Sequence, residues 1–353
     1  MNASGRRHSG EHDDEDTANT YRLHHRAGRG SRPRSKQRPA HAGAVSAFVV
    51  AVDRGRYTCQ LTDPAQFSDP VSTDPIRPIY VTAMRARELG RRAVIVGDYV
   101  ALVGDVSGAT GTLARIVRLR ERSSALRRSS EDGDSSERVV VANAQRLVIV
   151  VALTDPPPRT GFIDRCLVAA YDADIEPLLC LTKTDTPSAA DALKQLMHYY
   201  RGVNLAHVTT RYDRPVTQLA AELTGGICVL VGHSGVGKST LVNALIPDAQ
   251  RAIGELSGVG KGCHTTTAAL ALSLPDGGWI IDTPGVRTFG LAHVDTQTVL
   301  ASFPDLVEGS TRCPPGCRHH AGEPECGLDS WVAAGYAPAE RLSSLRSLIG
   351  GRR

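Results

Sequence analysis

The nine residues GHSGVGKST, from Gly232 to Thr240, have the types and spacing needed to bind phosphate. They fit the pattern G-x-x-x-x-G-K-[ST], in which glycines let the backbone turn its N–H groups toward phosphate oxygens. A helix expected directly after this loop adds the positive end of its dipole. We expect Lys238 to bind the outer phosphates and the Ser239 hydroxyl to ligate Mg²⁺. The predicted phosphate site comprises Gly232, His233, Ser234, Gly235, Val236, Gly237, Lys238, Ser239 and Thr240.

Two further motifs end apolar runs that are typical of buried strands. In DTPG, Asp282 suits the second coordination sphere of Mg²⁺ and the Gly285 N–H can meet the terminal phosphate. In LTKTD, Asp185 can accept hydrogen bonds from N1–H and the 2-amino group of guanine, which adenine lacks, so the motif favours GTP over ATP. The predicted guanine site comprises Thr182, Lys183, Thr184 and Asp185, with VTT at 208–210 as a supporting contact.

KGCHTTT, at 261–267, is a polar segment between the phosphate loop and DTPG. A GTPase keeps at this place the mobile loop whose threonine responds to Mg²⁺ and the terminal phosphate. We predict Thr266 as that threonine and as a second protein ligand of Mg²⁺, with Thr265 and Thr267 as alternatives.

The order of these motifs along the chain is unusual, because the guanine motif precedes the phosphate loop. A GTPase domain normally begins with the phosphate loop. The order therefore predicts a circularly permuted domain, in which all the motifs still meet at one sheet edge. The chain then runs from DTPG directly into the C-terminal segment, so the nucleotide state could move that segment.

The segment CPPGCRHHAGEPEC carries a compact set of metal-ligating residues. Three cysteines and one histidine suit a single tetrahedral, structural Zn²⁺ ion. The predicted ligands are Cys313, Cys317, His319 and Cys326, with His320 as the alternative histidine. Free thiols or a disulfide are the competing interpretations.

Composition and local pattern predict a multidomain α/β protein. The chain has 353 residues, of which 41% are hydrophobic and 22% charged, and its net charge is +4. Short apolar runs at 43–122 predict an OB-like β-barrel, after a disordered basic tail at 1–42. Polar residues 123–137 predict a flexible linker. Alternating strand and helix patterns at 138–298 predict the three-layer GTPase domain. Within it, the run VVVANAQRLVIVVAL (139–153) predicts one buried strand. Residues 299–353 are predicted to form a zinc-binding helical domain.

The sequence also argues against several classes of protein. It has no run of 18 or more apolar residues and no apolar segment typical of a secretory signal at its start. Five of its eight cysteines are scattered, which favours a reducing cytoplasm over a disulfide scaffold. We expect a cytoplasmic monomer.

Together the motifs resemble the ribosome small-subunit-dependent GTPase A family, known as RsgA or YjeQ. The resemblance runs from about Gly43 to the end and includes GDYVAL, IDRCLVAAYDADIEPLLCLTKTD, GHSGVGKSTLVNAL, GKGCHTTT, DTPGVRTFGL and the Cys/His cluster. It implies a barrel, a permuted GTPase domain and a zinc domain. It also implies binding to the small ribosomal subunit (16S rRNA and ribosomal proteins) late in assembly, with GTP hydrolysed to GDP and phosphate under stimulation by the subunit.

The resemblance also suggests a catalytic residue. Val286 stands where many GTPases place a glutamine that orients the attacking water. His264 is similar to the histidine proposed to replace it in the family, which would orient or deprotonate that water.

The chain departs from the family pattern at three places. Thr182 stands where the family typically has Asn, and Cys263 where it usually has Arg. The cluster C-x₃-C-x-H-x₆-C has one residue fewer in its first gap and one more in its last. Two other functions compete with an assembly GTPase: a GTP-regulated RNA- or ribosome-binding module in which hydrolysis is incidental, and a P-loop kinase or ATPase.

Overall fold

The structure, a computed structural model, describes residues 41–63, 78–89, 93–128, 138–250, 269–283, 289 and 291–351. The basic tail expected at 1–42 lies outside these residues except for its last two positions. The switch segment with His264 and Thr266, and Gly285 of DTPG, also lie outside them.

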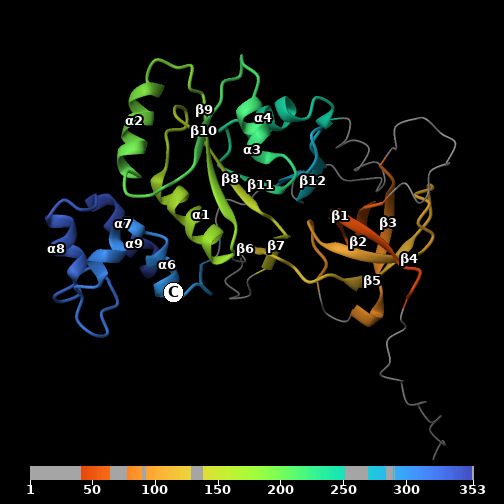
Figure 1. The fold of residues 1–353 in the computed structure, drawn as a ribbon, viewed down its shortest axis with the longest axis horizontal. Helices are drawn as coiled ribbons and strands as arrows, with labels where there is room; N and C mark the ends of the chain where they lie inside the picture. Colours follow the sequence, from red (N-terminus) through yellow and green to blue (C-terminus); the bar gives the residue numbers. More distant parts are fainter. Residues whose placement is uncertain are drawn as a thin grey trace, which may run out of the picture. The chain divides into compact units, whose positions relative to one another are not determined.

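Five strands near the start of the described chain form a closed barrel (Figure 1). They are β1 (Val45–Asp53), β2 (Arg56–Leu61), β3 (Tyr80–Arg85), β4 (Tyr99–Gly104) and β5 (Ala114–Leu119), with a short 3₁₀ turn, η2 (Arg87–Leu89), after β3. Their order is β1-β2-β3-β5-β4, and β4 pairs back onto β1. Alternate residues of each strand face a buried apolar centre, as expected for a small barrel whose interior is filled by side chains. The predicted barrel is confirmed.

A six-stranded sheet forms the centre of the second domain. Its order is β10-β9-β8-β11-β13-β12, and all neighbours are parallel except β13 and β12, which are antiparallel. The strands are β8 (Arg146–Ala152), β9 (Glu176–Thr182), β10 (His207–Thr209), β11 (Ile227–Val231), β12 (Leu270–Ser273) and β13 (Trp279–Asp282). Helices α1 (Thr160–Asp172), α2 (Ala189–Tyr199), α3 (Thr217–Leu223) and α4 (Lys238–Leu245) connect them. The motif order predicted a permuted α/β domain, and this arrangement confirms it.

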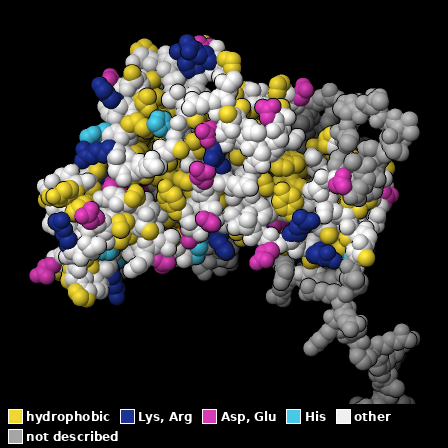
Figure 2. Space-filling view, viewed as in Figure 1, with side chains coloured by type: hydrophobic (Ala, Val, Ile, Leu, Met, Phe, Trp, Pro, Cys, Tyr) yellow, Lys and Arg dark blue, Asp and Glu magenta, His cyan; other side chains and the backbone are white. Residues whose placement is uncertain are grey.

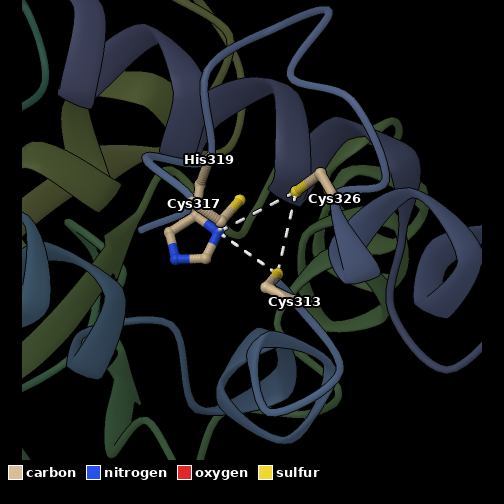
Figure 3. A group of neighbouring side chains, drawn as sticks. All are labelled: Cys313, Cys317, His319 and Cys326. Carbon is tan, nitrogen blue, oxygen red and sulfur yellow. Dashed lines mark hydrogen bonds between the residues drawn. The ribbon is translucent and has the colours of Figure 1, made fainter. Parts of the chain in front are cut away.

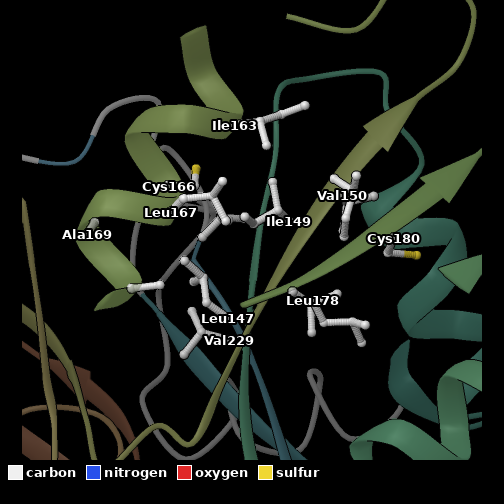
Figure 4. Packing of buried hydrophobic residues seen from close by; sticks show 14 of the residues in the cluster. Leu147, Ile149, Val150, Ile163, Cys166, Leu167, Ala169, Leu178, Cys180 and Val229 are labelled. Atoms are coloured by element: carbon white, nitrogen blue, oxygen red, sulfur yellow. The ribbon is translucent and has the colours of Figure 1, made fainter. Parts of the chain in front are cut away.

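The core of this domain is built from its longest apolar runs. Every residue of β11 is buried, as are six of the seven residues of β8, because parallel strands are covered on both faces. Figure 4 shows Leu147, Ile149 and Val229 of these strands packed toward Ile163 and Leu167 of α1. Four side chains spaced along α1 at helical period are fully or almost fully buried: Ile163, Cys166, Leu167 and Ala170.

The prediction of one long strand at 139–153 is wrong. The run is divided into β7 (Arg138–Ala142), which pairs with β6 (Ala125–Arg128) in a separate two-stranded sheet, and β8. The division falls at Asn143, whose φ of 57° lies in the left-handed region that Asn tolerates. Its side chain donates to Gly97 O at 2.8 Å and accepts from Ser123 N at 2.9 Å. Strand β6 lies inside the stretch that we expected to be a flexible linker.

The barrel is joined to the larger sheet by side chains and by one strand pair. Ala51 of β1 pairs with Leu270 of β12. The buried ring of Phe48 stacks on Trp279 of β13 with ring centroids 4.5 Å apart. These contacts bury apolar surface of both domains in one cluster.

Four helices follow the sheet toward the C-terminus: α6 (Thr296–Ala301), α7 (Pro304–Ser310), α8 (Gly327–Ala333) and α9 (Ala339–Gly350). The loop between α7 and α8 contains the Cys/His segment. None of the helices in the described residues combines the length and the apolar composition that a membrane span requires. On the face that Figure 2 shows, the described Lys and Arg side chains are interspersed with Asp and Glu rather than gathered by sign.

Candidate functional site: a phosphate loop, a base segment and a Cys/His cluster

The phosphate loop lies between β11 and α4, as its sequence predicts. Gly232 must lack a side chain, because a Cβ there would lie 2.5 Å from Val150 O of the neighbouring strand. Gly237 has φ of 99° and begins α4 from the left-handed region, which Gly adopts without steric cost. The loop can therefore present its N–H groups, and the N-terminus of α4, to one anion.

Lys238 crosses the loop from the first turn of α4. Its ammonium donates to Gly232 O at 2.6 Å and to His233 O at 3.0 Å. Burial lowers the pKa of Lys238, and the nearby charge of Asp282 partly offsets this effect. Ser239, the next residue, is exposed, so its hydroxyl is accessible to a metal ion.

Asp282 ends β13, and its backbone lies beside Leu230 of β11. Burial raises the pKa of its carboxyl, while the charge of Lys238 and the Thr283 N–H act in the opposite direction. Within the described part of the chain, Asp282 Oδ1 is buried and has no hydrogen-bond partner. A carboxylate oxygen of this kind suits the water shell of Mg²⁺, because Mg²⁺ keeps several of its waters when it binds. Ser239 and Asp282 thus fit the predicted ion.

The base segment follows β9 at the same sheet edge. Thr182, the last residue of that strand, donates from Oγ1 to Val236 O of the phosphate loop at 2.6 Å. Thr184 Oγ1 donates to Thr210 O at 3.2 Å, so the segment after β10 lies beside it. Asp185 is exposed. The two segments that were predicted to read the base therefore contact each other.

One neighbour of this segment was not predicted. The Lys183 ammonium donates to Asp155 O, in the loop between β8 and α1. On α1, the Phe162 ring packs on His233 of the phosphate loop with centroids 4.4 Å apart. The proline run at 156–158, directly after a buried strand, was the sequence signal for a loop at this edge.

The Cys/His segment brings four ligand atoms together (Figure 3). His319 Nδ1 lies 3.5 Å from Cys313 Sγ, 3.4 Å from Cys317 Sγ and 3.8 Å from Cys326 Sγ. Ligands of a tetrahedral zinc ion at about 2.0–2.3 Å are separated by about 3.5–3.8 Å. The four side chains fit a metal ion of that size, and the histidine among them is His319 rather than His320.

Comparisons with known proteins agree with this geometry. The family model for RsgA GTPases matches residues 119–292. The "small ribosomal subunit biogenesis GTPase RsgA" of Pseudomonas fluorescens strain SBW25 is 38% identical over 262 residues, which cover 73% of this chain and 74% of that protein. The chain belongs to the RsgA GTPase family. The protein of the same name from Pseudomonas aeruginosa strain LESB58 is also 38% identical over 262 residues.

Two solved structures have a similar fold. YjeQ from Thermotoga maritima has a TM-score of 0.64 and 23% identity, covering 88% of this chain and 98% of that one. YloQ, described as a circularly permuted GTPase, has a TM-score of 0.62 and 21% identity, covering 90% and 97%. This likeness shows that the chain has the fold of these permuted GTPases.

The predicted site residues of this RsgA-family chain divide into two groups. Those of the phosphate loop and the base segment, together with Asp282, lie at the carboxyl ends of β9, β11 and β13. The catalytic prediction His264, the magnesium prediction Thr266 and the phosphate contact Gly285 fall outside the described residues. Their roles stay predictions, as do the nucleotide contacts of the first group.

Proposed function

We propose that this chain is a GTPase that binds the small ribosomal subunit and acts in its late assembly, hydrolysing GTP to GDP and phosphate. The observation that carries the proposal is the 38% identity over 262 residues to relatives named for that role. The arrangement of Lys238, Asp282 and Asp185 at one sheet edge supports the chemistry. We further propose that the protein works as a monomer in the cytoplasm and contacts 16S rRNA and ribosomal proteins.

In this proposal the chain itself contributes positioning and charge. The phosphate loop and Lys238 would hold the phosphates, Ser239 and Thr266 would hold Mg²⁺, and Asp185 would read guanine. Bound Mg²⁺ neutralises charge that develops on the transferred phosphoryl group. His264 would orient or deprotonate the attacking water in the complex with the subunit.

We expect GTP turnover by the purified protein to rise strongly when small ribosomal subunits are added. His264→Ala should lower the rate of GTP turnover in the presence of subunits by at least about 100-fold, the usual contribution of a general base. His198→Ala, at an exposed position of α2, is the matched control and should retain full stimulation. Turnover is measured as phosphate release with and without subunits.

Two outcomes would contradict this mechanism. Stimulation that survives in His264→Ala would assign the water-orienting role to another residue. Turnover that subunits do not change would favour the second candidate, a GTP-regulated binding module. A clear preference for ATP in nucleotide competition would overturn the role of Asp185 in both candidates.

We also propose that the Cys₃His cluster holds one structural zinc ion through Cys313, Cys317, His319 and Cys326. A hydrogen bond to one of the sulfur atoms supports this proposal, because the Gly327 N–H donates to Cys313 Sγ at 3.2 Å and would stabilise a thiolate. A bound ion would connect the loop to the start of α8.

Metal analysis of two adjacent variants tests the zinc assignment. The unsubstituted protein should contain about one zinc per chain, as a closed Cys₃His site does. His319→Ala should lose most of it and unfold at lower temperature, whereas His320→Ala should keep it. If only His320→Ala loses zinc, His320 is the fourth ligand instead of His319. An unsubstituted protein that contains no zinc would contradict the zinc assignment.

A further inference from the structure

The carbonyl groups of a phosphate loop need partners of their own. A loop that turns its N–H groups toward an anion turns its C=O groups outward, and buried carbonyls are almost always hydrogen-bonded. Val236 is 3% exposed, and its carbonyl accepts the 2.6 Å bond from Thr182 Oγ1. Thr182 itself is 6% exposed, so this bond is shielded from water.

A threonine hydroxyl has a single hydrogen to donate. The other acceptor within reach of Thr182 Oγ1 is Val151 O, at 3.5 Å, which is much longer than the bond to Val236. The donor of Thr182 is therefore already used inside the protein. It is not free for N7 or O6, the hydrogen-bond acceptors on one edge of guanine.

The place of Thr182 in the chain makes the bond consequential. It is the last residue of β9 and directly precedes Lys183. Val236 lies two positions before Lys238, the first residue of α4. The bond joins the segment that carries Asp185 to the segment that carries Lys238, although 54 positions separate its two residues. It is a direct contact between the base segment and the phosphate loop.

We propose that Thr182 is a positioning residue that fastens the base segment to the phosphate loop and makes no contact with the guanine base. This corrects the guanine contact that the motif alone predicted for Thr182, and it rests on the proposed binding of guanine nucleotides. Recognition of the base then depends on Asp185 and Lys183, and Thr182 acts on affinity through the register of the two segments.

Binding of GDP and two of its analogues to two Thr182 variants tests the proposal. Thr182→Val keeps the shape and removes the donor, and Thr182→Ser restores it. The analogues are 7-deaza-GDP, which lacks the N7 acceptor, and 6-thio-GDP, whose sulfur accepts poorly. We expect Thr182→Val to bind GDP and both analogues about tenfold more weakly, by the same factor for each, because it leaves the Val236 carbonyl unpaired. Thr182→Ser should recover most of the affinity.

Ser124→Ala provides the control for loss of a buried hydroxyl as such. Ser124 Oγ donates to Ala144 O at 2.6 Å, the same length, at a place remote from the sheet edge that carries the motifs. The Ser124→Ala variant should unfold at a lower temperature but bind GDP with an unchanged dissociation constant. In GTP turnover, Thr182→Val should raise KM while kcat changes by less than about twofold, since bound nucleotide re-forms the register.

Two results would decide against the proposal. If Thr182→Val weakens GDP but not one analogue, Thr182 contacts the base at the altered atom. If Thr182→Val binds all three ligands as tightly as the unsubstituted protein, the bond to Val236 has no positioning role. Failure of the unsubstituted protein to bind GDP would instead overturn the proposed function, and this outcome is recognised without any variant.

Discussion

Replacing Arg341 with methionine is expected to destabilise the folded protein by about 3–5 kcal/mol, because it leaves two buried carboxylates without their cation. Arg341 lies on α9 and is 0% exposed. Its Nη1 donates to Asp164 Oδ1 on α1 at 2.7 Å, and its Nε and Nη2 donate to Asp305 on α7 at 3.0 and 2.8 Å. The side chains of Asp164 and Asp305 are 0% and 3% exposed.

The rest of this buried cluster is fully hydrogen-bonded. Asp164 also accepts from the hydroxyls of Tyr199, Tyr200 and Ser344, at 2.6, 3.0 and 2.6 Å. Burial, and then the charge of Asp164, raises the pKa of Tyr199, so its hydroxyl stays a donor. Burial acts against the charge of Arg341, but its bonds to Asp305 and the nearby carboxylates outweigh this and raise its pKa. Methionine would fill a similar volume and remove the three hydrogen bonds that the guanidinium group donates to Asp164 and Asp305, while the three hydroxyl donors to Asp164 would stay.

Fluorescence can locate the loss, because the chain has two tryptophans, Trp279 in the sheet and Trp331 on α8. In a Trp279→Phe background, Trp331 reports on the C-terminal helices alone. We expect Arg341→Met to shift the urea transition of Trp331 to lower concentration than the far-UV dichroism transition of the whole chain. The two transitions should coincide when Arg341 is present.

Two variants make the result interpretable. Arg341→Lys keeps the charge but lacks the planar fork that reaches both carboxylates, so an intermediate loss is expected. Arg211→Met removes an exposed bidentate pair with Asp213, at 2.9 Å for both bonds, and should change the stability much less, because solvent screens an exposed ion pair. Equal stability of Arg341→Met and Arg211→Met would contradict a role of the buried cluster in holding the helices.

The cluster also connects the C-terminal helices to the nucleotide side of the sheet. Helix α1 carries Phe162, which packs on His233 of the phosphate loop, and Asp164, which binds Arg341. The two residues are two positions apart on one helix. The sequence predicted that the C-terminal segment could respond to nucleotide through the chain after DTPG, and α1 provides a second, directly described contact between the same regions.

Local motifs made the phosphate loop and its strand ends predictable. The requirements there are local: glycine where a Cβ would collide, as at Gly232, and a polar residue where a buried strand ends, as at Asp282. The Cys₃His cluster was predictable for the same reason, since all four ligands lie within one short segment. The residue types and their spacing along the chain are therefore enough to predict sites of this kind.

Partners distant in the chain could not be predicted in this way. Arg341 and Asp164 are separated by 177 positions, and an arginine in APAERLSSLRSL is usually a solvated residue on a helix surface. The break at Asn143 was missed because apolar residues flank it on both sides, and its left-handed backbone depends on a bond to Gly97 of the barrel. The hydrogen bond from Thr182 to the phosphate loop was not predicted, because the motif indicates a contact with the ligand and not with the loop.

Asp282→Asn is expected to make the ligand-free protein more stable while lowering its GTP turnover by about 10–100-fold, the usual effect of losing a group that orients a metal's water shell. The amide has nearly the same shape and carries no charge. Burial disfavours the charge of Asp282, and its Oδ1 finds no partner among the described residues. Stability and activity should therefore change in opposite directions.

The pH dependence of unfolding identifies the cause. The pKa of Asp282 is higher in the folded protein than in the unfolded chain, so the protonated carboxyl favours folding. This stabilisation is fully present below the pKa of the unfolded chain. It is lost as the pH rises through the pKa of the folded protein. Asn carries no charge at any of these pH values. The difference in unfolding free energy between ligand-free Asp282→Asn and the ligand-free unsubstituted protein should therefore be largest at about pH 7 and disappear toward about pH 4. Asp276→Asn, in the exposed turn between β12 and β13, should show neither effect. An advantage that does not change with pH would trace the gain to packing, and a less stable Asp282→Asn protein at pH 7 would show that the charge contributes to folding through Lys238.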